Sequence, residues 1–366
     1  MSRVLFVDDS EDVLAGLRNR LRGQRGRWDM VFVQSGDEAL EELARAPFDV
    51  VVSDMRMPGM DGAELLSAVE ARHPEIARIV LSGDADRDAV ARVLPVVHHF
   101  LDKPCDGNVL KAAIERACAL RATLWNDGLR DFLGRLGPLP PLPPVYAELA
   151  RLARDGRLES AVVAATLVRG DALVGAPVSE LAAAAGLGSL DGLTPELLQV
   201  LTLASALFAL AGELPSLLGL RDEALRAARL ALRLMGASRG APSAFAAALL
   251  RDAGRIVLRQ ALRRLHGPLA DDAQLALDAP ATLAAIGAAL LGEWKIAPAI
   301  VETVAFADRA IGQRGAAIEP WGAVRAAEAC LAAASQADVD RILDDLAGAD
   351  RARWSDLVNE ARRSAK

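Results

Sequence analysis

Short apolar runs alternate with amphipathic stretches five times between Arg3 and about Arg121. The apolar runs have the length of strands and cover residues 3–8, 29–33, 49–53, 78–82 and 96–101. Stretches with helical spacing of apolar residues follow them, near residues 12–22, 36–45, 62–72, 86–93 and 107–121. This alternation predicts an α/β fold with a doubly wound, five-stranded parallel sheet and right-handed crossovers.

After Val145 the strand pattern gives way to helical spacing. We expect helices over residues 145–155, 158–169, 178–185, 195–211, 221–236, 242–264, 280–293 and 297–309. A separate helical tail is expected over residues 320–334 and 337–363. Frequent Ala and Leu allow close helix packing, and Gly or Pro separates most segments. The second half is therefore predicted to be all-α.

A proline-rich segment marks the boundary between the two halves. Helical spacing continues past the first half through Leu124 and Leu129, which predicts a connecting helix that packs on the second domain or on a second copy of the chain. Residues 137–144 then contain five prolines, which bar a helix. The predicted organisation is a first domain over 1–123, a connecting helix and linker over 124–144, a helical domain over 145–310, and a helical tail over 311–366.

Polar side chains stand where the predicted strands end. Asp8 and Asp9 follow the first run, Asp54 ends the third, Ser82 ends the fourth, and Lys103 follows the fifth. The carboxyl edge of an open α/β sheet is where ligands bind, so we expect these side chains to meet. Gathered carboxylates repel one another unless a cation neutralises them, and their hard oxygen atoms suit Mg²⁺. With a hydroxyl and an ammonium added, the set has the parts needed to place a phosphoryl group on a carboxylate.

Residues 1–123 resemble a response-regulator receiver domain, which has a flavodoxin-like fold and carries these residue types in this order. The resemblance implies that Asp54 is the phosphoacceptor and that a sensor histidine kinase is the partner that supplies the phosphoryl group. The Mg²⁺ ligands that it implies are three carboxylates and one backbone carbonyl: Asp8, Asp9, Asp54 and the carbonyl of Arg56. It also implies that Ser82 and Lys103 hold the phosphoryl group. Phe100 matches the family's switch aromatic, with Phe in place of the commoner Tyr.

Residues 138–309 resemble the HDOD domain, a helical domain related to HD-type metal phosphohydrolases. Three segments carry the resemblance: the opening 139–146, the stretch 248–258, and the helix pair over 286–301. Within the second segment, Asp252 and Gly254 match the family's Asp and the Gly that follows it. The resemblance implies that this half is the output domain of a response regulator.

The metal-binding histidines of the HD enzymes are missing from this half. Arg251 stands where the family has the His of its His-Asp pair, and Leu283 stands where another His is frequent. The His pair expected after the last helix falls near Phe306 and Ala307, and His266 is the single histidine of the second half. Several His and Asp ligands are needed to hold a hydrolytic metal. We therefore predict a non-catalytic output domain that binds a protein partner, with an HD-type cyclic-dinucleotide phosphodiesterase as the alternative. Binding of a nucleotide without hydrolysis stays open.

Charged residues also stand inside an otherwise apolar segment of the second half. Arg251, Asp252 and Arg255 lie among Ala, Leu, Ile and Val. Charges in such surroundings need partners, so we expect an internal ion pair.

Composition and charge narrow the function further. The chain has 366 residues and a net charge of -7; residues 1–125 hold 16 Lys or Arg against 21 Asp or Glu, and the remainder holds 26 against 28. Neither half has the basic footprint that DNA binding needs, which disfavours a third reading, a DNA-binding regulator. The three cysteines have no His companions, so neither a disulfide framework nor a zinc site is predicted. No apolar run reaches membrane-spanning length and the N-terminus opens directly into a strand, so we expect no anchor, no signal peptide and a cytoplasmic location.

Overall fold

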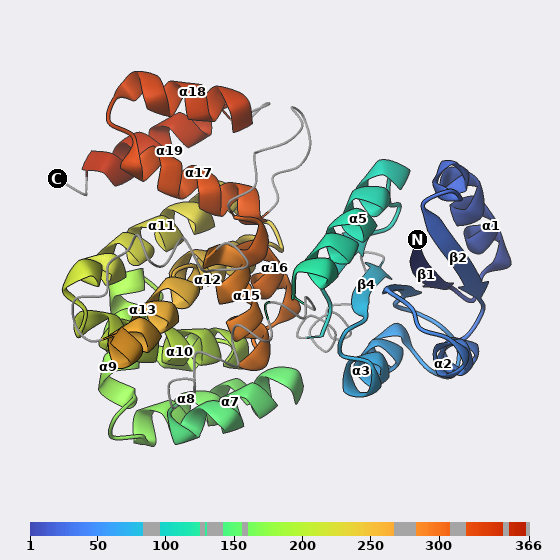
Figure 1. Cartoon of the computed structure of the whole chain (residues 1–366), viewed down its shortest axis with the longest axis horizontal. Helices are drawn as coiled ribbons and strands as arrows, with labels where there is room; N and C mark the ends of the chain where they lie inside the picture. Colours follow the sequence, from blue (N-terminus) through green and yellow to red (C-terminus); the bar gives the residue numbers. More distant parts are fainter. Residues whose placement is uncertain are drawn as a thin grey trace. The chain divides into compact units, whose positions relative to one another are not determined.

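The computed structural model describes residues 1–82, 96–124, 129, 142–155, 160–266, 283–307, 320–346 and 351–363. The chain divides into two compact units, which we call unit 1 and unit 2. Unit 1 is built around Met1–Asp127, and unit 2 is built around the helices that follow (Figure 1).

Unit 1 contains a parallel sheet whose strands lie in the order β2-β1-β3-β4-β5. The strands are β1 (Ser2–Val7), β2 (Trp28–Val33), β3 (Val50–Asp54), β4 (Ala77–Ser82) and β5 (His99–Asp102). Phe6 of β1 pairs with Phe32 on one side and with Val52 on the other. The strand order reverses direction at β1, so a crevice is expected at the carboxyl ends of β1 and β3. The predicted flavodoxin-like fold with a parallel sheet is confirmed.

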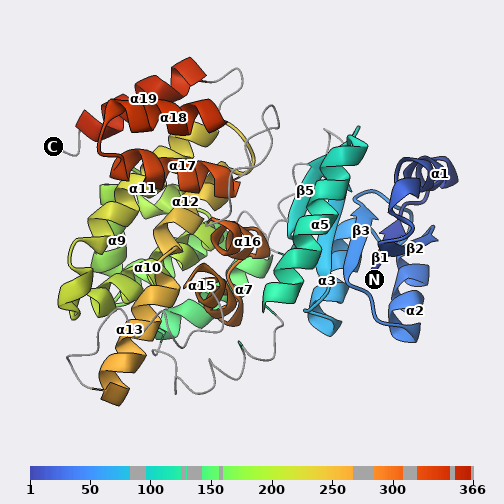
Figure 2. The same cartoon turned by 45° about the horizontal axis from the view of Figure 1, so that its top comes forward.

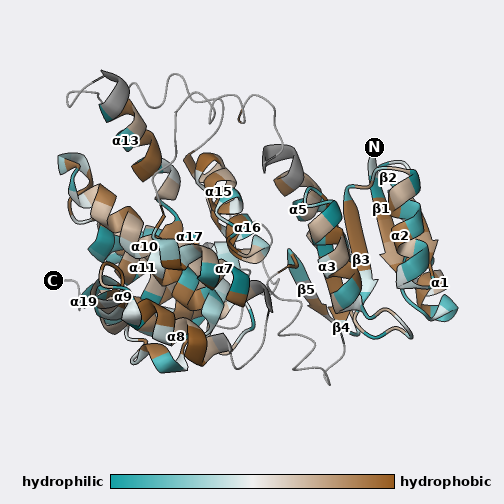
Figure 3. Ribbon diagram, turned by 90° about the horizontal axis from the view of Figure 1, so that it is seen from below, coloured by the Kyte–Doolittle hydropathy of each residue, from teal (hydrophilic) through white to brown (hydrophobic). Residues whose placement is uncertain are grey.

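Helices cover both faces of this sheet because alternate residues of each strand point to opposite sides. The helices are α1 (Glu11–Arg20), α2 (Gly36–Arg45), α3 (Gly62–Arg72) and α5 (Gly107–Leu124). Leu5 and Val51 pack in one core with residues of α2 and α3, whereas Val4 and Phe6 pack in a second core with residues of α1 and α5. In Figure 3 β3 is coloured hydrophobic, as expected of a parallel strand that is buried on both faces. Helices α1 and α2 show both hydrophobic and hydrophilic residues, as expected of helices with one face on the core and one in solvent.

The last strand is shorter than predicted. It begins at His99 and not at residue 96, because side chains bind the segment that precedes it. Arg78 is buried and donates from Nε to the carbonyl of Val96 at 2.6 Å, and its backbone N–H donates to Nδ1 of His98 at 3.0 Å. The predicted helix near 86–93 lies outside the described residues.

Every described element of unit 2 is helical. The α-helices are α7 (Pro144–Asp155), α8 (Ser160–Gly170), α9 (Gly175–Ala185), α10 (Pro195–Gly212), α11 (Leu220–Met235), α12 (Ala241–Leu250), α13 (Ala253–His266), α15 (Leu283–Glu293), α16 (Pro298–Phe306), α17 (Pro320–Ala332), α18 (Gln336–Leu346) and α19 (Arg351–Arg363). The prediction of a helical remainder is confirmed.

Buried hydrogen bonds hold helix α7 against the core of unit 2. The hydroxyl of Tyr146 on α7 donates to the carbonyl of Trp294 at 2.8 Å. Gln199 of α10 is 2% exposed, and its Nε2 donates to the Tyr146 hydroxyl at 3.1 Å and to the carbonyl of Lys295 at 3.2 Å. Each buried polar group here has a partner, so the network fixes α7 against α10 and the turn after α15.

Two long predicted helices are each divided in the structure. The helix predicted over 242–264 is wrong as a single element, because α12 ends at Leu250 and α13 begins at Ala253. At this break α13 approaches α15 closely: a Cβ on Gly254 would lie 2.6 Å from the backbone nitrogen of Gly287. Glycine is therefore required at 254 for the two backbones to meet. The helix predicted over 337–363 is also two elements, α18 and α19.

Helices α17–α19, described above as an expected separate tail, are part of unit 2. α17 packs on α11 and α12, as Figure 2 shows, and α19 packs on α11 and α18. Trp354 and Val358 of α19 are fully buried. Arg233 of α11 pairs with Glu360 of α19 at 2.5 Å.

The expectation that no apolar run reaches membrane-spanning length needs correction. Helix α10 has 18 residues and is apolar enough to cross a membrane by length and composition. Leu198, Leu201 and Leu203 on this helix are fully buried inside unit 2. A helix at the centre of a helical core meets the same criteria, so its length and apolar composition follow from its buried position.

Candidate functional site

The carboxyl edge of the sheet gathers the residues that the sequence placed at strand ends. Asp8 and Asp9 follow β1, and Asp54 is the last residue of β3. One carboxylate oxygen from each of these three residues lies within 4.8 Å of the others. Asp8 is buried and Asp9 is exposed, so the cluster has one side against the core and one side open to solvent.

Lys103 bridges two of the three acids. Its Nζ lies 2.8 Å from Oδ1 of Asp54 and 2.9 Å from Oδ2 of Asp8. Its backbone N–H donates to the carbonyl of Ser82 at 2.7 Å, which joins the ends of β4 and β5. The Lys103–Pro104 peptide bond is cis. The ammonium group is thus held at the position where a group bound to Asp54 would need a cation.

The backbone around Asp54 is fixed by the start of α3. The N–H of Gly62 donates to the carbonyl of Met55 at 2.9 Å, and a Cβ on Gly62 would collide with the carbonyl oxygen of Asp54. The N–H of Met55 donates to Oδ1 of Asp54 at 2.7 Å, while Ser53 donates from Oγ to the Asp54 carbonyl at 2.8 Å. The carboxylate is therefore held by its own strand end and by the helix that follows.

Asp8 is oriented by the start of α1. The N–H of Ser10 donates to Oδ1 of Asp8 at 3.0 Å. Ser10 is also the N-cap of α1, where its Oγ accepts from the N–H of Val13 at 3.4 Å. Neither Ser10 nor Gly62 is among the site residues predicted from the sequence. A serine before a predicted helix is a recognisable cap signal, whereas the contact of Gly62 with β3 requires the fold.

The two central ionisable groups have pKa values shifted by their surroundings. Burial raises the pKa of Asp54 above 3.8 and the charge of Asp8 adds to this rise, although Lys103 and the N–H of Met55 act in the opposite direction. Burial lowers the pKa of Lys103, but the hydrogen bonds and charges of Asp54 and Asp8 outweigh it and leave that pKa above 10.5. Lys103 is therefore charged at neutral pH.

The donor set fits a divalent cation. Three carboxylates against one ammonium leave a formal charge of -2 at the cluster, because only Lys103 offsets Asp8, Asp9 and Asp54. Oxygen ligands with an open side are what Mg²⁺ takes when it also binds phosphate oxygens and water. Asp8, Asp9 and Asp54 could hold such an ion, and Arg56 follows two residues after Asp54 on the chain.

The two remaining predicted residues flank this cluster on neighbouring strands. Ser82 is fully buried at the end of β4. Phe100 lies on β5 and pairs with Val80 of β4, and its side chain lies outside the described part of the structure.

In unit 2, the positions matched to the metal ligands of HD enzymes hold ion pairs and apolar side chains. Arg251 pairs with Glu328 of α17, and Asp252 lies 4.0 Å from Nη1 of Arg255. The segment therefore contains the expected ion pair, between Asp252 and Arg255, and a second pair that joins Arg251 to Glu328 of α17. Leu283 and Phe306 offer no ligand atoms. Among the described residues, the acidic cluster of unit 1 is the one group of three or more side chains that could hold a metal.

Comparison with known proteins identifies the first part of the chain. Residues 4–115 match the family model of the response regulator receiver domain. The uncharacterized transcriptional regulatory protein YesN of Bacillus subtilis is 31% identical over 121 residues, which cover 32% of this chain and 33% of YesN. The DNA-binding transcriptional regulator NtrC of Escherichia coli is 38% identical over 115 residues, which cover 31% of this chain and 24% of NtrC.

The chain spans about a quarter to a third of the length of the curated relatives named here. Part of the chain is also similar to a solved structure, the signal receiver domain of an HD domain-containing protein from Pseudomonas fluorescens. The two are 29% identical, with a TM-score of 0.32, and the match covers 33% of this chain and 98% of that one.

Proposed function

We propose that this chain, whose residues 4–115 form the response regulator receiver domain of a two-component system, uses phosphorylation of Asp54 to control unit 2 as a non-catalytic output domain. The observation that carries the proposal is the cluster of Asp8, Asp9, Asp54 and Lys103 at one sheet edge. A sensor histidine kinase is the proposed phosphodonor, and the cytoplasm is the proposed location.

The residues of the cluster divide the work of phosphoryl transfer. The Asp54 carboxylate attacks the phosphorus atom, so an oxygen–phosphorus bond forms as the bond to the donor breaks. Lys103 then exchanges its contact with the free carboxylate for the transferred phosphoryl oxygens, and the Ser82 hydroxyl donates a hydrogen bond to them. Bound Mg²⁺ would neutralise charge on the phosphoryl oxygens. Asp8, Asp9, Asp54 and the carbonyl of Arg56 are its proposed ligands.

Phosphorylation is proposed to change the conformation of β4 and β5, the strands next to Asp54. A phosphoryl group can shift a conformational equilibrium only by the difference in its binding energy between the two states. Ser82 ends β4 and Phe100 lies on the neighbouring β5, so contacts of Ser82 with the phosphoryl oxygens bias the position of both strands. We propose that the change is read on the face made by β5 and α5, in dimerisation or in contact with unit 2.

Unit 2 is proposed to be a docking domain of the HDOD type. Arg251 offers a fixed positive charge where a metal would need a neutral ligand, and this charge repels a divalent cation. The guanidinium of Arg251 also forms an ion pair with Glu328, so this position is occupied by a charged pair and offers no metal ligand. The function proposed for this domain is binding of a protein partner.

The relatives named as transcriptional regulators do not alter this reading of unit 2. Their matches span a third or less of this chain, within a length that the receiver domain accounts for. The net charge of -7 gives no basic footprint for direct DNA contact. A DNA shift that weakens as salt is raised would contradict this part of the proposal.

Labelling with a small phosphodonor tests the receiver chemistry. The full chain is incubated with acetyl phosphate and Mg²⁺, and the covalent phosphoryl group is located by mass spectrometry. We expect one group on Asp54, no labelling of Asp54→Asn, and normal labelling of the exposed control Asp37→Asn. Equal labelling of the original protein and Asp54→Asn would show that the nucleophile is another residue.

Metal analysis tests the output domain. We expect the full chain to contain no stoichiometric Mn or Fe and to leave cyclic dinucleotides intact, in both the original protein and Arg251→His. One restored histidine beside Asp252 still leaves the ligand shell too small for a hydrolytic metal. Stoichiometric metal together with turnover would establish the phosphodiesterase alternative.

A further inference from the structure

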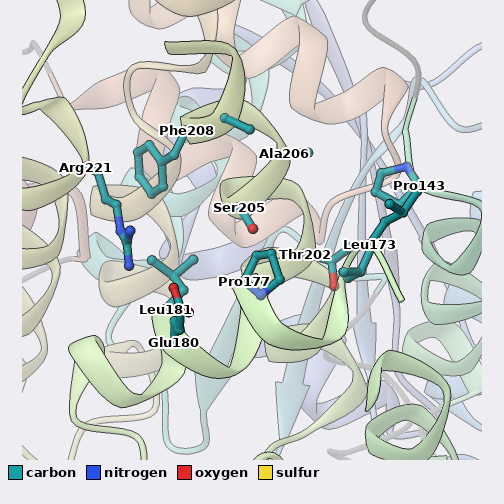
Figure 4. Close-up of a pocket in the computed structure, with 12 residues that line it drawn as sticks. Pro143, Leu173, Pro177, Glu180, Leu181, Thr202, Ser205, Ala206, Phe208 and Arg221 are labelled. Atoms are coloured by element: carbon teal, nitrogen blue, oxygen red, sulfur yellow. The ribbon is translucent and has the colours of Figure 1, made fainter. Parts of the chain in front are cut away.

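Two cavities in the described residues differ in how their polar groups are arranged. In the groove between α9 and α10, Arg221 and Thr202 lie at opposite ends, so they do not converge on one ligand (Figure 4). A second cavity, of about 360 Å³, lies in unit 1 beside β2. Its lining comes largely from one edge of the sheet and includes Arg18, Arg25, Trp28, Asp29, Met30 and Phe32. This edge has no role in the function proposed above.

Strand β2 has backbone groups that point away from the sheet. It is the edge strand of the described sheet, where it pairs with β1 alone. The carbonyls of Arg27 and Val33 each accept a hydrogen bond at 3.3 Å from N–H groups at either end of β1. Alternate residues of a strand direct their backbone groups to opposite sides. The N–H and C=O groups of Trp28, Met30 and Phe32 therefore point outward, where the described sheet has no strand.

The same three residues place their side chains on one face of the sheet. Trp28, Met30 and Phe32 pack in one core with residues of α1. Trp28 is buried, whereas Met30 and Phe32 are half-buried. The ring of Phe32 stacks on Phe6, and the guanidinium carbon of Arg18 lies 4.7 Å from the centroid of Phe32. The edge thus combines outward backbone groups with a partly open apolar surface.

The segment that leads into β2 is strongly basic, although residues 1–125 hold more acidic than basic side chains. No acidic residue stands between Asp12 and Asp29. Five arginines stand in the same interval: Arg18, Arg20, Arg22, Arg25 and Arg27. The amino end of β2 is therefore a local patch of positive charge, whereas Asp54 stands at the carboxyl edge of the sheet.

Two of these arginines have no acidic partner in the described part of the chain. Arg18 pairs with Glu11 at 2.5 Å, and Arg27 pairs with Glu115 at 3.0 Å. The side chains of Arg22 and Arg25 are exposed and form no ion pair with any residue that the structure describes. Arg25 also lines the cavity beside β2. Positive charge is thus available next to the outward backbone groups.

The charge selects among the strands that could add to this edge. Charged side chains beside an edge strand are a common device against pairing of identical edges. Two copies of this chain paired through β2 would bring the arginines of both into one interface. An acidic strand would instead neutralise them, and complementary charge favours one partner over others. The edge therefore fits an acidic strand better than a second copy.

We propose that the edge of β2 binds an extended acidic segment of a partner protein, which adds to the sheet as an antiparallel strand. Its backbone pairs with Trp28, Met30 and Phe32, and its apolar side chains enter the cavity. Its carboxylates lie at Arg22 and Arg25. In this mode of recognition the backbone hydrogen bonds supply affinity, and the pockets for alternate side chains supply specificity. The surface belongs to the receiver and does not depend on unit 2.

Fluorescence anisotropy on the full chain with a designed peptide tests the proposal. In the peptide three valines alternate with three threonines, and two glutamates follow. We expect it to bind about tenfold more tightly than the version with two glutamines, because each carboxylate forms a charge-assisted hydrogen bond with an arginine. The difference should shrink as salt is raised. Equal binding of the two versions, or no binding at millimolar concentration, would overturn the proposal.

Two N-methylated peptides test strand addition itself. In an antiparallel pair the residues directly opposite each other have side chains on the same face, so the valine N–H groups are the ones directed at β2. Methylation of the valine nitrogens should weaken binding at least about thirtyfold, because several backbone hydrogen bonds are lost. Methylation of the threonine nitrogens places the methyl groups on the outer edge and should leave binding unchanged. Equal loss in both peptides would contradict strand addition.

Variants of the chain assign the two sides of the contact. Met30→Pro removes an outward N–H without breaking the ladder to β1, so it should abolish binding. Arg25→Gln should weaken the glutamate peptide about tenfold and leave the glutamine peptide unchanged. Arg72→Gln is the control, because this exposed residue lies on α3 outside the cavity. Identical affinities in Arg25→Gln and Arg72→Gln would contradict the assignment, even where Met30→Pro does not fold.

Two further measurements separate this proposal from its alternatives. Sedimentation of the full chain tests the second copy: a dimer that Met30→Pro dissociates, together with no peptide binding, would assign the edge to self-association and overturn the acidic partner. Asp54→Asn should bind the glutamate peptide normally. Failure of peptide binding and failure of the phosphorylation proposal are therefore distinguishable.

Discussion

At the scale of single residues, the carboxylates of the acidic cluster repel one another when no cation is bound. Asp54 is partly buried, lies near Asp8 and Asp9, and has Lys103 as its counter-charge. The net effect raises its pKa above 3.8, with burial as the largest cause. The ionised carboxylate is therefore less favourable in the folded protein than in the unfolded chain.

This raised pKa predicts that Asp54→Asn stabilises the protein at neutral pH in the presence of a chelator. A raised folded-state pKa contributes stability that is fully present below the unfolded pKa and is lost as the pH rises through the folded one. The variant should unfold with about 1 kcal/mol more free energy at pH 7, and the difference should vanish below pH 3.8, where Asp54 is protonated in both states. Urea unfolding across this pH range measures it. A variant that is less stable at pH 7 would show that the attraction of Lys103 outweighs the burial of Asp54.

How far sequence could predict this site depends on the kind of residue. Asp8, Asp9, Asp54 and Lys103 were predictable because strand runs show where each strand ends, and parallel strands bring those ends together. Gly62 could not be found this way, because its role is a contact between α3 and the end of β3 that exists only in the fold.

At the scale of elements, close approaches between backbones decide where helices begin. Gly62 opens α3 directly against β3, so any side chain there must displace the strand end that carries Asp54. Gly16 lies inside α1, where a Cβ would meet only the end of the Arg20 side chain at 3.5 Å. The two glycines thus offer a matched comparison.

We expect Gly62→Ala and Gly16→Ala to have opposite effects. Gly62→Ala should cost about 1–3 kcal/mol of unfolding free energy through overpacking and should slow labelling of Asp54. Gly16→Ala should gain about 0.5–1 kcal/mol because alanine is the better helix former. Thermal unfolding and acetyl phosphate labelling provide the measurements. A neutral Gly62→Ala would mean that α3 can shift without affecting the site.

The break between α12 and α13 was not predictable from periodicity. Apolar spacing continues through Arg251 and Asp252, so the sequence favours one helix over 242–264. The structure interrupts it at Arg251 and Asp252, shortly before Gly254 meets the backbone of α15. Glu328 was missed for a related reason: it lies far along the chain, and only packing of α17 on α12 brings it to Arg251.

The Arg251–Glu328 pair should therefore stabilise the packing of α17 against the turn between α12 and α13. We expect Arg251→Ala and Glu328→Ala each to lower the free energy of unfolding by about 1–2 kcal/mol, because each removes an ion pair between two partly buried side chains. The double variant should lose less than the sum, with a coupling energy of about 1 kcal/mol. Additive losses would show that the pair contributes nothing.

At the scale of the whole molecule, the chain joins a receiver domain with an acidic cluster to a helical unit that keeps Asp252 but has Arg251, Leu283, Phe306 and Ala307 at the positions matched to histidines. Fold class was readable from the sequence in both units, because apolar runs of strand length alternate with helical spacing before the proline-rich segment, whereas helical spacing alone follows it. Packing of α17–α19 into unit 2 was not readable, since amphipathic helices do not show which surface they will cover.

The most direct test of the central claim is hydrogen exchange of the full chain with and without Mg²⁺ and a beryllofluoride mimic of the phosphoryl group. We expect the mimic to change exchange at β4, at β5 and in helices of unit 2, because phosphorylation of Asp54 is proposed to control the output domain. Asp54→Asn should show no such change under the same conditions. Unit 2 exchange that is identical with and without the mimic, while the receiver responds, would contradict the account.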